Sequence, residues 1–408
     1  MMASAAFSLK TAGPRQVRTH ALKARRGVRA QASALSDLMN ARPLSKDDQT
    51  VRSEVSRYYG ETLSDSSDLK TSACCTPNAL PTILKEALSR VPDEVKAKYY
   101  GCGSPLPAGI DGLRVLDLGS GSGRDCYVAA ALVGPEGSVT GVDMTDAQLD
   151  VARKYVDDYT QDTLGYSSSN VKFVKGQIEY LDDAGIEDSS VDLIISNCVI
   201  NLSPDKERVL REAYRVLADG GEFYFSDVYC DRRLPQHVRE HEVLYGECLA
   251  GALYIEDFKR LCAQAGFLDA RILEGHEIEI HDPELKEITG NAKFYSLTYR
   301  LFKLPGLMET LCEDYGQVAT YKGTLPGHAH NYALDDHHLF ETGKPMLVCG
   351  NTAAMVGENG VSWLSKHFEV RGDRTTHFGL FDCGPSPVAS PASPAAAAAP
   401  SASGGSCC

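Results

Sequence analysis

Several features that are common in protein sequences are missing from this chain. No apolar run approaches the roughly 20 residues that a helix needs to cross a membrane. No two of the 13 cysteines have the Cys-x-x-Cys spacing of a structural zinc site. The net charge of −14 argues against a surface for nucleic-acid phosphates. We therefore expect neither a membrane nor a nucleic acid as a partner, and monomer is the default state. The 408 residues, 43% of them hydrophobic, are enough for one large α/β domain and a smaller one.

The two ends of the chain differ in composition from its middle. Residues 1–36 contain no Asp or Glu and carry Lys and Arg among Ala, Ser and Thr, which is typical of an organelle transit peptide. We expect a chloroplast rather than a mitochondrial destination; the alternative is a disordered basic tail on a cytoplasmic protein. Residues 384–408 are rich in Ala, Pro and Ser, which predicts disorder.

A glycine-rich stretch lies at the centre of the sequence. A short apolar run around Leu116 predicts a buried parallel strand, and residues 126–132 read as a helix. Between them lies Asp-Leu-Gly-Ser-Gly-Ser-Gly, from Asp117 to Gly123. A dinucleotide site needs Gly-x-Gly-x-x-Gly, which neither Gly119 nor Gly121 begins. The stretch instead resembles the first motif of class I S-adenosylmethionine methyltransferases, and this resemblance predicts a Rossmann-like fold.

A second strand, residues 138–144, carries Asp143 at its end, where an acid can accept hydrogen bonds from ribose hydroxyls. The alternative is that Asp143 only caps the next helix. Strands at 171–174, 191–196 and 222–227 alternate with helices at 147–160 and 204–217, the latter ended by Gly220 and Gly221. This alternation predicts a doubly wound parallel sheet, with the site at the carboxyl ends of its strands, near Gly119, Asp143 and Asn197.

We divide the rest of the chain by composition. Residues 37–113 form a helical segment containing Cys74 and Cys102, and residues 114–282 form the main domain, with a helical stretch at 237–265 and a strand at 271–280. Residues 283–383 form a smaller mixed α+β region with short strands such as 294–302, for which we expect a lid or channel role. Its histidines permit a metal site, but solvated loop residues are the favoured interpretation; they are His328, His330, His337 and His338.

Three cysteines lie inside specific motifs. These motifs are Tyr-Tyr-Gly-Cys-Gly at residues 99–103, Ser-Asn-Cys-Val-Ile-Asn-Leu at 196–202 and Gly-Glu-Cys-Leu-Ala-Gly-Ala-Leu at 246–253. Together with the glycine-rich stretch and Gly-Val-Asp-Met at 141–144, they closely resemble the arsenite methyltransferases, in a form with a transit-like segment as in plants and algae. The resemblance covers about residues 59–302, and more loosely extends to 383.

The resemblance implies methylation of arsenite and methylarsenite for detoxification, with S-adenosylmethionine as cofactor. Cys102, Cys198 and Cys248 match the thiols that hold trivalent arsenic, and Cys74 matches a cysteine that pairs with Cys102 during turnover; the adjacent Cys75 makes that match less secure. The residues that fall around the cofactor, including those of the glycine-rich motif, are Tyr100, Asp117, Gly119, Ser120, Gly121, Gly123, Asp143, Met144, Ile178, Glu179 and Asn197.

The chemistry of these residues agrees with this interpretation. Trivalent arsenic is soft and prefers thiolates, and Cys198 ends a strand beside the predicted cofactor site. The methyl transfer needs mainly positioning, which can lower a barrier by roughly 7–11 kcal/mol. Glutathione or thioredoxin would reduce a Cys74–Cys102 disulfide.

Two other functions stay open: a class I methyltransferase with a small organic acceptor such as a quinone or sterol, and a non-catalytic arsenic-binding protein. The terminal Cys407 and Cys408 could capture arsenic, accept prenyl groups or have no function. We expect Cys126, Cys262 and Cys349 to be buried free thiols.

Overall fold

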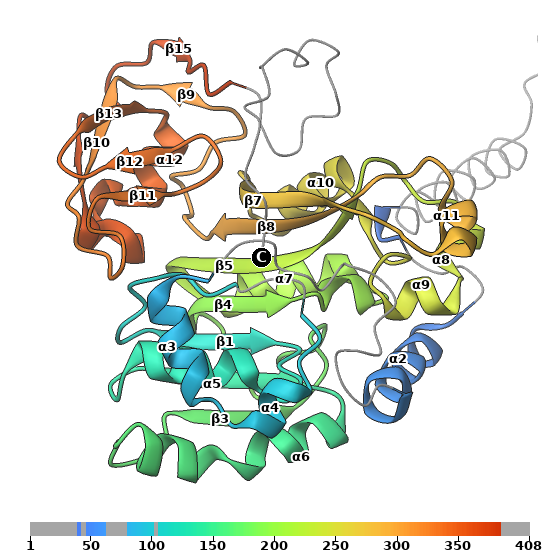
Figure 1. Ribbon diagram of the computed structural model, residues 1–408. Helices are drawn as coiled ribbons and strands as arrows, with labels where there is room; N and C mark the ends of the chain where they lie inside the picture. Colours follow the sequence, from blue (N-terminus) through green and yellow to red (C-terminus); the bar gives the residue numbers. More distant parts are fainter. Residues whose placement is uncertain (1–38, 42–45, 63–79, 102–104, 385–408) are drawn as a thin grey trace, which may run out of the picture.

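The computed structural model describes residues 39–41, 46–62, 80–101 and 105–384. The predictions for residues 1–36, the C-terminal tail, Cys74, Cys75, Cys102 and Cys407–Cys408 lie outside these ranges. The main sheet has the strand order β3-β2-β1-β4-β5-β8-β7, and β6 pairs with β5 (Figure 1). Its strands are β1 (Arg114–Leu118), β2 (Ser138–Asp143), β3 (Val171–Lys175), β4 (Val191–Asn197), β5 (Leu217–Cys230), β6 (Leu253–Tyr254), β7 (Arg271–Ile278) and β8 (Phe294–Phe302).

Helices cover both faces of this sheet. The strands from β3 to β5 are parallel, so both of their faces need apolar cover, and Leu116 and Ile194 are fully buried. One face packs against α7 (Lys206–Val216) and α10 (Ile255–Ala265). The other packs against α3 (Thr82–Arg90), α5 (Arg124–Val133) and α6 (Asp146–Lys154). Shorter helices flank these layers: α2 (Asp48–Arg57), α4 (Asp93–Ala97), α8 (Gln236–Arg239), α9 (Glu242–Gly246) and α11 (Pro283–Thr289).

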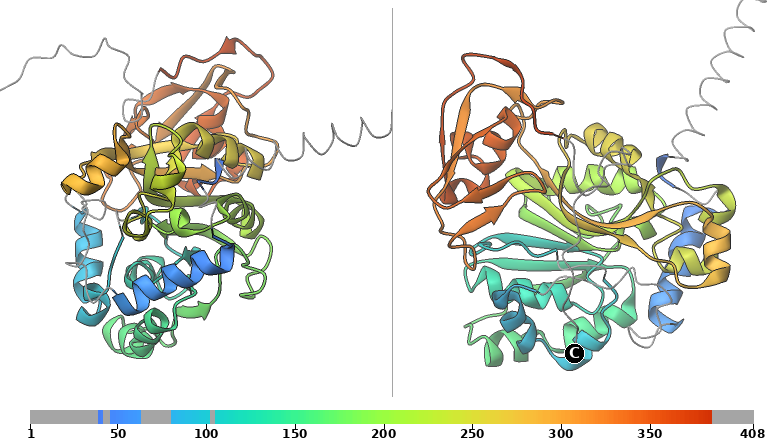
Figure 2. Two further views of the ribbon diagram at one scale, coloured as in Figure 1. Left: turned by 90° about the vertical axis from the view of Figure 1, so that its right-hand side faces the viewer. Right: turned by 45° about the horizontal axis from the view of Figure 1, so that its top comes forward.

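A smaller unit follows β8 and lies beside the sheet as a separate lobe (Figure 2). Its strands form a three-stranded sheet, β13-β10-β14, and two two-stranded sheets, β11-β12 and β15-β9. They enclose an apolar core of their own around α12 (Gly350–Val356). The strands are β9 (Glu313–Asp314), β10 (Gln317–Tyr321), β11 (Asn331–Ala333), β12 (Leu339–Glu341), β13 (Pro345–Val348), β14 (Phe368–Arg371) and β15 (Gly379–Leu380).

A buried ion pair within the sheet holds two residues of the lobe by hydrogen bonds. Arg300 on β8 makes two hydrogen bonds to the Glu222 carboxylate on β5, at 2.6 and 2.9 Å. Arg300 also donates to the Tyr332 hydroxyl at 2.6 Å, and the Trp363 indole N–H donates to Glu222 at 2.9 Å. Because Tyr332 and Trp363 belong to the lobe, the charged pair fixes the lobe against the edge of the parallel strands.

The predicted fold class is confirmed: a doubly wound α/β sheet with a smaller mixed α+β region at the C-terminal end. The division at residue 283, however, cuts through the sheet, because β8 pairs with β5 over residues 294–302. Antiparallel pairing with a strand so far back in the chain leaves no local sequence signal, so composition alone places these residues in the smaller region. The smaller unit therefore begins after Phe302.

Some helix boundaries also differ from the prediction. The stretch at 237–265 is not one helix, because α8, α9 and β6 precede α10. The helix predicted at 147–160 ends at Lys154 and is followed by a π-helical turn, Asp158–Thr163. Helix α7 ends without a glycine cap: Leu217 is extended and starts β5 directly. Gly220, at φ +88°, instead lies against the carbonyl of Val361 in the lobe.

The histidines of the lobe do not form one cluster. His330 and His337 are exposed, as expected for loop residues, and His328 is partly buried. His338 is the exception, since it is 5% exposed and its Nδ1 lies 2.8 Å from an Asp335 oxygen. The prediction of a solvated histidine is therefore wrong for His338.

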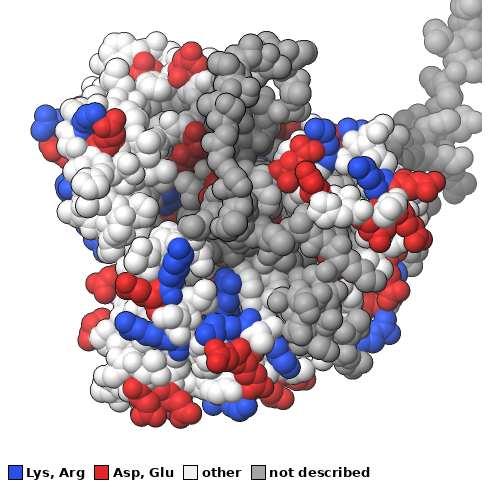
Figure 3. All heavy atoms as spheres, viewed as in Figure 1, with Lys and Arg blue, Asp and Glu red and all other residues white. Residues whose placement is uncertain are grey.

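The surface carries charges of both signs. On the face shown in Figure 3, Lys and Arg side chains are interleaved with Asp and Glu. Within the part of the chain that the structure describes, every helix is too short or too polar to span a bilayer.

Candidate functional site

The glycine-rich turn after β1 is fixed against the neighbouring strands. The N–H groups of Gly119 and Ser120 donate to the Val142 carbonyl on β2, at 2.8 and 3.0 Å. Gly119 has a φ of +70°, and a Cβ atom there would lie 2.4 Å from Val199 Cγ1. Only glycine combines this backbone conformation with such a close approach. The turn thus places polar backbone and Ser120 at the carboxyl end of the sheet.

A cavity opens at this end of the sheet. It lies between the ends of β1, β2 and β4 and the N-terminal segments that carry Arg52 and Tyr100. Ten of the eleven residues predicted to surround the cofactor line it: Tyr100, Asp117, Gly119, Ser120, Gly121, Asp143, Met144, Ile178, Glu179 and Asn197.

Gly123 is the predicted residue that does not line the cavity. It precedes α5 as its N-cap, with a φ of +91°. A Cβ atom there would lie 2.6 Å from the ring of Phe173, so this glycine allows α5 to pack closely against β3. The alternation of glycines in the sequence does not distinguish a residue that faces the ligand from one that faces the sheet.

Asp143 lies at the end of β2 with its carboxylate turned toward the glycine-rich turn. Its two oxygens accept the N–H groups of Gly121 and Thr145, at 2.9 and 2.8 Å. The N-cap residue of α6 is Thr145, so Asp143 does not cap that helix. Each carboxylate oxygen has a further lone pair, which leaves capacity for hydroxyl donors in the cavity.

Carboxyl groups give the cavity its electrostatic character. Burial, together with the charge of Asp125, raises the pKa of the Asp117 carboxyl to about 8. Burial also raises the pKa of Asp143, against the hydrogen bonds that it accepts from Thr145 and Gly121. Asp125 is balanced by Arg124 at 2.9 Å and accepts the Asn197 amide at 3.0 Å. A positively charged ligand bound beside these acids would favour their ionised forms, against the effect of burial.

Other groups in the cavity wall are suited to a polar ligand. Ser120 Oγ, Gln148 Oε1 and Arg52 Nη2 are buried and have no hydrogen-bond partner within the described ranges. Buried polar atoms normally have partners, so these three atoms are available to a bound molecule. A ligand that joins an adenosyl group, with its ribose hydroxyls, to an amino acid, with its ammonium and carboxylate, matches this set of acceptors and donors.

The sequence did not point to two side chains of the cavity wall, Arg52 and Gln148, or to Lys206, which contacts the wall residue Ser203. Arg52 on α2 donates to the Glu179 carboxylate at 3.3 Å, and the Gln148 amide donates to the Tyr59 carbonyl at 2.9 Å. Lys206 is fully buried below Ser203 and donates to its carbonyl at 2.9 Å, and burial lowers the pKa of Lys206 to about 8. None lies in a motif, and the spacing of such long-range pairs leaves no local pattern.

Two of the predicted cysteines lie together beside the cavity. Cys198 directly follows β4 and lines the cavity, while Cys248 follows α9. The Cys248 thiol donates to the Cys198 carbonyl at 3.2 Å, and the two side chains are 4% and 3% exposed. Cys198 is in a disulfide. Cys198 therefore has to be reduced before it can act as a thiolate.

Both cysteines have a strained backbone. Cys198 has a φ of +56° and Cys248 a φ of +62°, a region that costs a non-glycine residue roughly 1–2 kcal/mol. Strain of this kind persists where the surrounding structure fixes the residue, and it gathers at functional sites. Nothing in the sequence signals it, because left-handed backbone is expected of Gly or Asn rather than Cys.

Comparison with known proteins agrees with this geometry. A family model for a methyltransferase domain matches residues 110–266. Over 335 residues the chain is 56% identical to an arsenite methyltransferase of Aquipseudomonas alcaligenes, covering 82% of this chain and 95% of that protein. The chain belongs to the arsenite methyltransferase family. The human arsenite methyltransferase is 45% identical over 311 residues, covering 76% of this chain and 81% of its own.

A solved member of the arsenite methyltransferase family shares the fold. It is an arsenic(III) S-adenosylmethionine methyltransferase from Chlamydomonas reinhardtii, with 67% identity and a TM-score of 0.72. The match covers 74% of this chain and all of that one. The resemblance inferred from the cysteine motifs is thus confirmed, including the similarity to an algal form.

Proposed function

We propose that this arsenite methyltransferase family member transfers the methyl group of S-adenosylmethionine to trivalent arsenic, with arsenite and methylarsenite as acceptors, in arsenic detoxification. The observation that carries the proposal is the position of Cys198. It lines the same cavity as Asp117 and Asp143, and its carbonyl accepts the Cys248 thiol. A soft-ion ligand therefore lies at the edge of a pocket suited to a cationic nucleoside.

The cavity residues would hold the cofactor by complementary charge and hydrogen bonding. Asp143 would accept from the ribose hydroxyls, Ser120 and Gln148 offer unused polar atoms, and Asp117 adds a carboxyl group to the cavity wall. S-adenosylmethionine supplies a methyl group on a positively charged sulfur, which makes that methyl an electrophile. The protein contributes position and the exclusion of water, and orientation alone is worth roughly 7–11 kcal/mol.

The thiols would hold the acceptor. Cys198 and Cys248, with Cys102 as the third ligand, would bind trivalent arsenic as a pyramid of thiolates, the ligand type that soft ions prefer. No general base is required, because the lone pair of trivalent arsenic carries no proton. The positive φ at Cys198 and Cys248 marks two positions that the surrounding structure constrains.

Thiol redox chemistry would complete the cycle. Methylation leaves arsenic formally pentavalent, and two electrons from a thiol pair return it to the trivalent state as those thiols form a disulfide. Cys74 and Cys102 are the pair that we propose, and glutathione or thioredoxin would reduce their disulfide. The same reductant would open the disulfide that holds Cys198.

The deciding experiment incubates the full chain with S-adenosylmethionine, arsenite and glutathione, and separates arsenic species by chromatography with element-specific detection. We expect methylated arsenic from the parent and from Cys262→Ala, a buried thiol in the sheet core, but not from Cys198→Ser or Cys248→Ser. Arsenite that binds without being methylated would favour the non-catalytic arsenic-binding protein. Transfer to a quinone or sterol, with no arsenic product, would favour the organic acceptor.

A further inference from the structure

Three cysteines that are far apart in the sequence meet in the C-terminal lobe. The sulfur atoms of Cys312, Cys349 and Cys383, here called the lobe triad, lie within 4.8 Å of one another. All three are free thiols. The prediction that Cys349 is a buried free thiol is confirmed, and the structure adds two sulfur neighbours.

The short strands of the lobe bring the triad together. Cys312 directly precedes β9 and Cys383 follows β15, and these strands pair through Asp314 with Gly379 and Glu313 with Leu380. The Phe381 N–H donates to the Cys312 carbonyl at 2.8 Å, which extends the pairing toward Cys383. Cys349 lies between β13 and α12. The backbone segments that carry the three cysteines thus hold the triad together.

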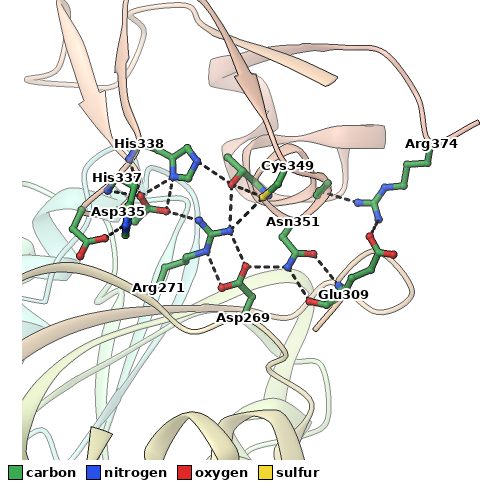
Figure 4. Close-up of polar contacts among 12 residues, drawn as sticks. Asp269, Arg271, Glu309, Asp335, His337, His338, Cys349, Asn351 and Arg374 are labelled. Carbon is green, nitrogen blue, oxygen red and sulfur yellow. Dashed lines mark hydrogen bonds and ion pairs between the residues drawn. The ribbon is translucent and has the colours of Figure 1, made fainter. Parts of the chain in front are cut away.

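Donors converge on the sulfur of Cys349. The Thr352 N–H lies 3.4 Å from it, the Thr352 hydroxyl 3.3 Å and an Arg271 guanidinium N–H 3.7 Å (Figure 4). Hydrogen bonds within the triad, and the charge of Arg271, lower the pKa of Cys349. Cys349 is fully buried, whereas Cys312 and Cys383 are partly exposed. The Cys349 sulfur therefore accepts hydrogen bonds in the interior, and a small molecule can reach the triad from the side of Cys312 and Cys383.

The charged side chains around the triad favour a trivalent ion over a divalent one. Arg271 is already neutralised, since it donates to Asp269 at 2.7 and 2.8 Å and to Asp335 at 2.8 Å (Figure 4). Three thiolates around a trivalent ion make a neutral complex, which adds no buried charge. Three thiolates around Zn²⁺ would leave one negative charge, and structural zinc prefers four ligands. Within the described ranges, the group that could hold an ion here consists of the three cysteines, without a fourth His, Cys, Asp or Glu ligand.

We propose that Cys312, Cys349 and Cys383 form a second binding site for trivalent arsenic. Arsenous acid would lose its three hydroxyl groups as water, each with the proton of one thiol, while three As–S bonds replace three As–O bonds. Nothing is oxidised or reduced. The lobe triad lines no part of the cofactor cavity, and its strands lie on the opposite side of the molecule from α9 in Figures 1 and 2. This site is thus separate from Cys198 and Cys248, and it does not depend on methyl transfer.

The first test measures binding stoichiometry in the full chain, without S-adenosylmethionine. The protein is reduced with a thiol-free phosphine and incubated with arsenite, and the bound arsenic is counted after gel filtration. We expect Cys312→Ser, Cys349→Ser and Cys383→Ser each to bind about one equivalent less than the parent, with Cys262→Ala unchanged. Equal binding of arsenic by all five proteins would overturn the proposal of a second site. It would not bear on the proposed methylation activity.

The second test begins with the parent protein, in which no substitution can cause a folding defect. Maleimide labelling of the parent protein, read by mass spectrometry, should slow at least tenfold at Cys312 and Cys383 when arsenite is present. X-ray absorption at the arsenic edge of Cys198→Ser/Cys248→Ser should then show three sulfur ligands. Labelling that arsenite does not slow, or a triad that retains Zn²⁺ and rejects arsenite, would refute the assignment.

Discussion

Replacing Gly119 by alanine tests whether the close approach at the glycine-rich turn supports the cofactor site. The new Cβ atom would lie 2.4 Å from Val199 Cγ1 and 2.5 Å from Cγ2, and φ is +70°. The left-handed backbone costs alanine roughly 1–2 kcal/mol. Moving the Val199 side chain adds a cost of overpacking, about 1–3 kcal/mol. Together they predict a loss of about 2–5 kcal/mol in the free energy of unfolding.

A matched glycine separates the two costs. Gly112 has a φ of +75°, and a Cβ atom there would meet nothing within 4 Å. Gly112→Ala should therefore show only the backbone cost of roughly 1–2 kcal/mol. Adding Val199→Ala to Gly119→Ala removes the two nearest clashing atoms and leaves the residue-199 Cβ atom, at 2.9 Å. A double-mutant cycle on this pair should return a favourable coupling of about 1–3 kcal/mol.

The assays are urea unfolding and calorimetric binding of S-adenosylmethionine. Gly119 and Val199 both line the cavity, so Gly119→Ala should also weaken cofactor binding at least tenfold, about 1.4 kcal/mol, while Gly112→Ala should not. Equal losses of stability in Gly119→Ala and Gly112→Ala, with cofactor affinity unchanged in both, would show that Val199 yields freely and that the reasoning is wrong.

Two further predictions concern buried charges. The raised pKa of Asp117, about 8, means that its contribution to stability is full below about pH 4 and is lost as the pH rises to about 8. In urea unfolding at pH 5, 6.5 and 8, Asp117→Asn should therefore lose less stability with rising pH than the parent, and parallel curves would contradict this. Arg300→Met should cost about 3–5 kcal/mol, because Glu222 stays buried without its partner, whereas Glu222→Leu/Arg300→Met should cost much less. A single variant within 1 kcal/mol of the parent would show that the pair is not needed to join lobe and sheet.

Local sequence patterns predicted the parallel half of the sheet and its ligand-binding edge. Apolar runs mark β1 and β4 because both faces of a parallel strand are buried, and the positions of Asp143 and Asn197 follow from where those strands end. The cysteine motifs placed Cys198 and Cys248 at one site, and the structure brings them together.

The features that sequence reasoning missed depend on long-range geometry. Strand β8 pairs with residues more than 60 positions earlier, as in Glu222 with Phe302. The sequence of β8 predicts a strand but not which strand it pairs with. The contact between Arg52 and Glu179 and the lobe triad have the same origin. Backbone conformation was also invisible, since residue type gives no sign of the positive φ at Cys198 and Cys248.

The antiparallel pairing of β8 with β5 sets a limit on where the chain can be cut and on when it can fold. A fragment ending at residue 282 would keep every parallel strand, yet it would leave β5 without the partner that pairs with it from Glu222 to Cys230. An open, apolar strand edge is a template for aggregation. During synthesis, β5 stays unpaired along this edge until residue 302 has left the ribosome. The sheet therefore cannot be completed from its N-terminal strands alone. A soluble catalytic fragment, if one is wanted, should therefore extend at least through Phe302.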